Sequence, residues 1–215
     1  MFKIHLTDNK KIQFINRSLR MRKCIFKGRF LCAVIFDMQN YSTLKSIKYP
    51  GGDKMKIIKT GIKPYLFFCA AALSAGGLSA LFTSKNMSLF DGIKKPLLSP
   101  PAAVFPIVWT VLYILMGISA ARVYQRRSLN PAAAKRGLET FAVSLIFNFF
   151  WSIFFFNARA YLFSFLWLAV LWALVLLTIV FYKKIDRPSG NLQLPYLIWL
   201  TFAGYLNLFI YLLNR

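Results

Sequence analysis

The stretch that decides the fold covers residues 94–113 and reads KKPLLSPPAAVFPIVWTVLY. Proline lacks a backbone donor and restricts the residue before it, so the four prolines of this stretch resist regular structure. From Val104 to Ala121, however, the chain is apolar and carries the aromatic side chains of Phe105, Trp109 and Tyr113. This combination predicts a stiff, proline-rich segment that leads directly into a membrane-spanning helix.

The composition of the whole chain favours a membrane protein. Of 215 residues, 58% are hydrophobic and 16% are charged, whereas soluble domains carry about 25% charged residues. The net charge of +22 is also compatible with nucleic-acid binding. The basic residues, however, lie in an N-terminal tract and in short gaps between apolar runs. That pattern is typical of membrane topology, so we expect no nucleic-acid partner.

Five apolar runs are long enough to cross a bilayer, and none alternates between apolar and polar residues as a barrel strand does. The sequence therefore predicts an all-α membrane protein, a bundle of five helices near residues 64–82, 105–124, 138–156, 161–182 and 192–213. The third and fourth runs are separated only by NARA, residues 157–160, which predicts a helical hairpin. Asn130 and Pro131 form a helix start. The turn-forming residues of DRPSGNLQLP, residues 186–195, predict a loop before the fifth run.

The first 54 residues differ in composition from the rest. They are rich in Lys and Arg and show no sustained period. GGDKM, residues 51–55, can be encoded by a purine-rich ribosome-binding sequence ahead of a start codon. We therefore expect Met55 to be the true start, with residues 1–54 being translated upstream sequence or a disordered basic tail. After Met55, most Lys and Arg residues fall on one side of the spans, which predicts a cytoplasmic Met55 side and Arg215 outside.

Few residues are suited to acid–base or metal chemistry. The only histidine is His5, no C-x-x-C pair occurs, and after Met55 the only acids are Asp91, Glu139 and Asp186, all near predicted loops or helix ends. We therefore expect no metal and no cofactor, and we disfavour hydrolysis and ion-coupled transport.

Amide and aromatic side chains remain inside the spans. Asn148 and Asn207 are expected either to bond neighbouring helices or to anchor a ligand. Tryptophans occur at Trp109, Trp151 and Trp199, either as interfacial residues or as pocket walls. Small residues in AALSAGGLSA, residues 71–80, are suited to close helix packing within the bundle or to a dimer face.

Three segments carry a resemblance: the opening stretch extended to residue 117, NFFWSIFFF at 148–156, and LPYLIWLTFAGYLNLFIYLLN at 194–214. Together they resemble the translocator protein family, also called the tryptophan-rich sensory protein or peripheral-type benzodiazepine receptor family, over residues 55–215. The resemblance implies a five-helix bundle, usually dimeric, in a membrane that we expect to be the bacterial cell membrane. It also implies a pocket closed by the first loop, with porphyrins, sterols and benzodiazepine-type drugs as ligands.

The resemblance also implies site residues. The ligand-binding set is Trp109, Tyr113, Asn148, Trp151, Trp199, Ala203, Leu206 and Asn207. Trp109 and Trp199 are in addition implicated in light-dependent porphyrin breakdown by some bacterial members. The lid set is Pro96, Leu98, Pro100, Pro101, Ala103 and Pro106, where the prolines stiffen the loop and lower the entropy cost of binding. The family commonly has aromatic residues where this chain has Leu89, Leu98 and Ala103.

Three functions follow from the resemblance. The first is a membrane binding and regulatory protein for porphyrins and similar rigid lipophiles. The second is a light-dependent porphyrin-degrading enzyme, and the third is a transporter of porphyrin or sterol-like lipophiles. The sequence leaves the choice among them open.

Overall fold

The computed structural model describes residues 61–87, 92–101 and 103–215. The predictions for residues 1–54, Met55, Leu89 and Asp91 lie outside these ranges.

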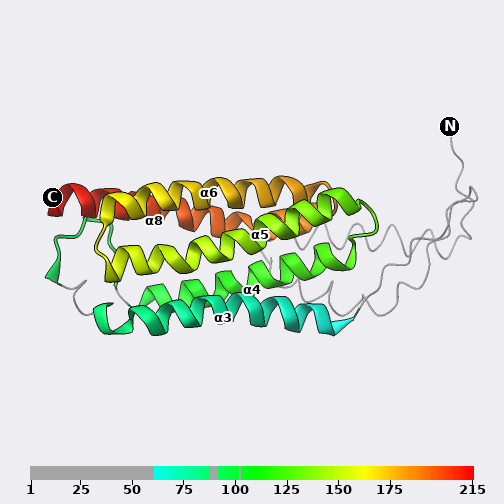
Figure 1. Cartoon of the computed structure of the whole chain (residues 1–215), viewed down its shortest axis with the longest axis horizontal. Coiled ribbons are helices and arrows are strands. Elements are labelled where there is room, and N and C mark those ends of the chain that lie inside the picture. The colour runs from blue at the N-terminus through cyan, green and yellow to red at the C-terminus, as the bar shows by residue number, and fades with distance from the viewer. Residues whose placement is uncertain (1–60, 88–91, 102) are drawn as a thin grey trace, which may run out of the picture. The chain divides into compact units, whose positions relative to one another are not determined.

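The part of the chain that the structure describes is helical and contains no strand. Its long helices are α3 (Ile62–Met87), α4 (Val104–Gln125), α5 (Pro131–Ser152), α6 (Tyr161–Lys183) and α8 (Leu194–Asn214). They run side by side in alternating directions along one long axis (Figure 1). Five spans, with α5 and α8 extended by short neighbouring helices, are long and apolar enough to cross a membrane, so the predicted five-span all-α fold is confirmed.

Two local features differ from the expectation or add to it. The residues from Ile153 to Asn157 continue α5 as a π-helix, labelled η3, which the sequence did not predict. The loop predicted from DRPSGNLQLP is wrong, because Arg187–Leu192 form the short helix α7. Asp186 caps that helix by accepting a hydrogen bond from the Ser189 amide, and a proline in the first turn needs no donor.

The start of α5 is formed as predicted. The side chain of Asn130 accepts a hydrogen bond of 3.2 Å from the Ala133 amide, and Pro131 occupies the first helical position. The amide bond satisfies a donor that the first helical turn leaves unpaired.

Small residues bring α3 and α4 into close contact. A Cβ atom on Gly117 of α4 would lie 2.5 Å from the Cα of Cys69 on α3, and one on Gly76 would overlap the ring of Tyr113. Ala72, one turn before Gly76, is fully buried. The small-residue stripe therefore packs within the bundle at Ala72 and Gly76, whereas Ala80 is exposed.

Amide side chains fasten the connections at the end of the bundle that holds the chain's C-terminus (Figure 1). The predicted hairpin between α5 and α6 is present, and Arg159 in it has a left-handed φ of 52°. Asn157 donates to the Phe82 carbonyl and accepts from Asn86. Asn214, at the end of α8, accepts from the backbone amide of Lys94 and donates to its carbonyl. The first loop is thereby tied to the last helix.

Candidate ligand-binding site

Four aromatic rings from α4 and α8 meet inside the bundle, and we call them the aromatic cluster: Trp109, Tyr113, Tyr196 and Trp199. Trp109 stacks on Tyr113 with ring centroids 5.5 Å apart and meets the other two edge to face, at 6.1 Å from Tyr196 and 6.4 Å from Trp199. Phe105 extends the cluster by an edge contact of 6.0 Å with Trp199. Such edge and offset contacts are the arrangements that aromatic rings prefer.

Helical periodicity explains why these residues come together. Trp109 and Tyr113 are four residues apart on α4, and Tyr196 and Trp199 are three apart on α8, so each pair shares one helix face. Three of these rings were predicted as site residues. Tyr196 was missed as one, although it belongs to the quoted LPYLIW motif, three residues before the predicted Trp199.

Hydrogen-bonding groups accompany the rings. Asn148 on α5 is buried, and its amide donates to the hydroxyl oxygen of Tyr113 at 2.7 Å, so the interhelical bond expected of this residue is present. Among the described residues, the Tyr196 hydroxyl and the Trp199 indole N–H are buried without a hydrogen-bond partner. The cluster therefore presents both flat apolar surfaces and unused polar groups.

The remaining predicted pocket residues form a second group around Asn207. In the amide orientation that pairs donors with acceptors, Asn207 accepts from the Trp151 indole at 3.2 Å and donates to the Tyr161 carbonyl at 2.8 Å. Trp151 also stacks on Phe155. The polar groups of Asn207 and Trp151 are thus used in bonds between α5, α6 and α8. Ala203 and Leu206 are buried on α8 between Trp199 and Asn207.

The predicted lid residues lie along the loop before α4. Two of its prolines open turns, closed by the bonds from the Ser99 amide to the Pro96 carbonyl and from the Val104 amide to the Pro101 carbonyl. Leu98 and Ala103 are exposed, Pro96 is buried and Pro100 is half-buried. Pro106 lies inside the first turn of α4, where a backbone donor would have no helical partner.

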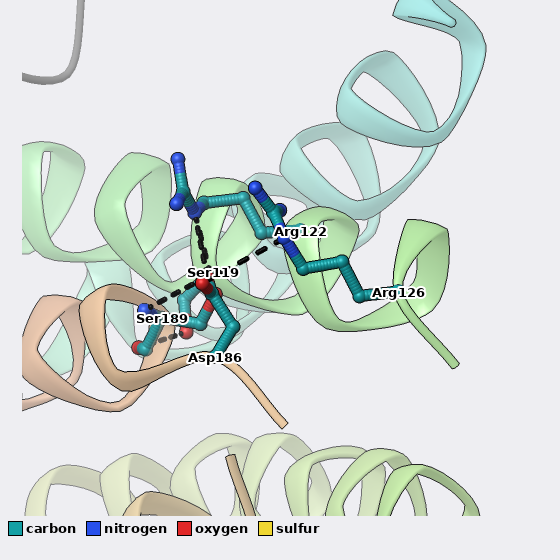
Figure 2. A network of polar contacts seen from close by, with 5 residues as sticks. All are labelled: Ser119, Arg122, Arg126, Asp186 and Ser189. Atoms are coloured by element: carbon teal, nitrogen blue, oxygen red, sulfur yellow. Dashed lines mark hydrogen bonds and ion pairs between the residues drawn. The ribbon is translucent and has the colours of Figure 1, made fainter. Parts of the chain in front are cut away.

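A polar network at the opposite end of α4 was not predicted (Figure 2). It comprises Ser119, Arg122, Arg126, Asp186 and Ser189. The Arg122 guanidinium lies 3.0 Å from one carboxylate oxygen of Asp186, and Arg126 lies 3.7 Å from the other. The Ser189 hydroxyl also donates to Asp186, and Ser119 donates to the Ser189 carbonyl at 2.7 Å. The network fastens α7 to α4.

The charges of this network determine the ionisation of Asp186. Burial by itself would raise the pKa of Asp186, but the positive charges of Arg122 and Arg126, with hydrogen bonds from Ser189 and Arg122, hold it below its usual value. A signal for the pair existed in the sequence, since Arg122 interrupts an otherwise apolar run and Asp186 precedes a helix-starting proline. Only the fold, however, brings the two together.

The described residues contain no group of three or more His, Cys, Asp or Glu side chains that could hold a metal ion. The aromatic cluster offers ring surfaces for stacking and groups for hydrogen bonding. The fold and this site define a class: a multi-pass helical membrane protein whose bundle carries an aromatic cluster between two spans.

Comparison with known proteins gives the family. The sequence profile of the TspO/MBR family matches residues 67–213, and the chain belongs to this family, which confirms the resemblance. Protein CrtK of Rhodobacter capsulatus is 39% identical over 149 residues, 69% of this chain and 91% of the relative. Tryptophan-rich protein TspO of Chlorobaculum tepidum is 34% identical over 147 residues, which are 66% of this chain and 90% of the relative. Translocator protein of Ovis aries is 28% identical over 118 residues, which are 55% of this chain and 70% of the relative.

Proposed function

We propose that this integral membrane protein binds porphyrins and similar rigid lipophilic ligands in the aromatic cluster, as a binding and regulatory protein. The observation that carries the proposal is the meeting of Trp109 and Trp199, from two different spans, with their rings 6.4 Å apart. A flat apolar ligand gains both burial and ring contacts against such a surface. The loop before α4, with its two proline turns, limits the entropy lost when a lid orders over a ligand.

The test is a titration of the purified protein with protoporphyrin IX in the dark, followed by tryptophan fluorescence. We expect saturable quenching that Trp109→Phe combined with Trp199→Phe removes or strongly weakens. Trp172→Phe is the matched control, because this indole hydrogen-bonds to Thr201 and, among the described residues, has no ring contact with the cluster. Equal affinity and quenching in the double variant and the wild type would contradict the proposal.

A second candidate function, light-dependent porphyrin breakdown, is favoured by the same pair of indoles. Its signature is loss of porphyrin absorbance on illumination that needs Trp109 and Trp199. The titration repeated under light distinguishes it from binding alone. Movement of porphyrin into sealed vesicles would instead indicate transport.

We further propose that the protein is a homodimer in a bacterial cell membrane with the Met55 side in the cytoplasm. The bias of Lys and Arg toward that side supports the orientation. Two of the relatives named above come from bacteria. The small residues Ala70 and Ser74 of α3 are exposed and suited to close approach of a second copy. Labelling of single cysteines from each side tests the orientation, and light scattering of the protein in detergent tests the dimer.

A further inference from the structure

The hydroxyl of Tyr196 lies at the aromatic cluster and is buried there. The side chain is 1% exposed, and its oxygen is buried without a hydrogen-bond partner among the described residues. Buried polar groups in proteins are nearly always paired, because in an apolar interior nothing replaces the lost bond to water. An unpaired hydroxyl at the edge of a candidate binding site therefore points to a partner supplied from outside the chain.

A second hydroxyl lies nearby. Tyr113 stacks on the Trp109 ring with centroids 5.5 Å apart, and Tyr196 meets the same ring edge to face at 6.1 Å. The Tyr113 oxygen already accepts a bond from Asn148, so its own proton is the group that it can still offer. Two phenols that contact the Trp109 ring therefore each have a proton to offer to a ligand.

We propose that Tyr113 and Tyr196 form a subsite that binds an acceptor oxygen, the carbonyl or carboxylate of a flat and otherwise apolar ligand held against Trp109. The inference rests on the proposed function in one respect, that the aromatic cluster is a ligand site. It adds the chemical class of the ligand's polar group. It also assigns Tyr196, for which neither the sequence motifs nor the comparisons gave a role. A ligand that lacks the acceptor leaves both donors unpaired and is rejected for that reason.

The chain offers a matched control. Tyr182 is also fully buried, and its hydroxyl has no hydrogen-bond partner among the described residues. It lies at the contact of α6 with α5, where a Cβ on Gly137 would come 2.9 Å from its ring. Within the described part of the chain, its ring has no aromatic contact with the cluster. Tyr182→Phe therefore removes the same atom from the same kind of environment, away from the proposed subsite.

The experiment compares fluorene with 9-fluorenone, which differ by one carbonyl oxygen, through tryptophan quenching of the protein in lipid nanodiscs. We expect the wild type to prefer fluorenone by about tenfold or more. Tyr196→Phe should abolish that preference by weakening fluorenone alone, and Tyr182→Phe should preserve it. Partition into the lipid is the same for all three proteins, so a change in the ratio reports the site. No preference in the wild type, or equal weakening of both probes by Tyr196→Phe, would overturn the subsite.

A second measurement needs no ligand. If the Tyr196 hydroxyl makes its hydrogen bond only to a ligand, Tyr196→Phe should leave the melting temperature of the ligand-free protein unchanged or raise it. A clear decrease would show that the hydroxyl is already bonded within the chain and would overturn the proposal. Fluorenone preference without saturable protoporphyrin binding would remove the porphyrin function and retain the subsite. Porphyrin binding without fluorenone preference would retain the porphyrin function and remove the subsite.

Discussion

The aromatic cluster and the polar network both join α4 to the segment formed by α7 and α8. They differ in whether their buried polar groups have hydrogen-bond or ion-pair partners. In the network, both carboxylate oxygens of Asp186 face a guanidinium. In the cluster, the Tyr196 hydroxyl and the Trp199 N–H have no hydrogen-bond partner in the part of the chain that the structure describes. An unpaired buried group costs stability, so a ligand that pairs the groups of the cluster should gain from them, whereas Asp186 already has its partners within the chain.

The comparison predicts that the largest loss of stability comes from the network. Asp186→Leu leaves two guanidinium groups without their carboxylate, in a place where the Arg122 and Asp186 side chains are 7% and 11% exposed. We expect destabilisation by about 3–5 kcal/mol, measured by thermal unfolding in detergent. The control is Glu139→Gln, because its pair with Lys135 is 3.9 Å apart and both side chains are more than half exposed. That change should stay within about 0.5 kcal/mol. Similar losses of stability from both substitutions would show that the network does not stabilise the contact between α7 and α4.

Low pH should weaken the same network without a mutation, because it protonates Asp186. The folded-state pKa of Asp186 lies below its ordinary value of 3.8. Its contribution to stability is therefore complete above that value and is lost as the pH falls through the folded-state pKa. Melting temperatures recorded from pH 7 down to pH 2.5 should fall more steeply below about pH 4 for the wild type than for Asp186→Asn. Parallel curves would contradict the role given to this carboxylate.

A smaller effect is expected where α3 supports the aromatic cluster. Gly76→Ala places a methyl group against the Tyr113 ring, which should cost about 1–3 kcal/mol and displace the ring, so porphyrin affinity falls as well. Gly77 is the adjacent control, because a Cβ there meets nothing within 4 Å. Gly77→Ala should be neutral or stabilising by up to about 1 kcal/mol. If Gly76→Ala retains full affinity, the position of Tyr113 does not matter for binding.

The smallest effect concerns the lid. Ala103 is exposed, and the resemblance indicates that an aromatic residue is common there. Ala103→Trp adds one ring that can stack on a bound porphyrin, worth about 0.5–1.5 kcal/mol, or up to about tenfold in affinity. The gain should appear as slower release in stopped-flow dissociation, with the empty protein melting as before. Leu97→Trp, at a fully exposed position of the same loop, should change neither rate nor stability. An unchanged release rate in the Ala103 variant would remove this part of the loop from the site.

The sequence predicted the structure correctly where a sequence pattern is compatible with one kind of local structure only. Long apolar runs in a bilayer must pair their backbone groups internally, so five runs become five helices. Asn130 followed by Pro131 begins a helix in the structure as predicted. The loop predicted at residues 186–195 failed because Asp, Pro, Ser and Gly favour both turns and helix starts. The contact with α4 decides between these alternatives, and it is not local in sequence.

The sequence by itself determined the class of the molecule, its five spans, the tryptophans and amides within them, and the family to which the chain belongs. The tertiary structure alone decided which of these side chains meet. It placed Tyr196 beside Trp109 and paired Arg122 with Asp186, which are 64 residues apart along the chain. The physical reason is that helical periodicity fixes which residues share a face of one helix. The rotation and depth of neighbouring helices are fixed by contacts such as that of Gly76 with Tyr113, which exist only after the bundle has packed.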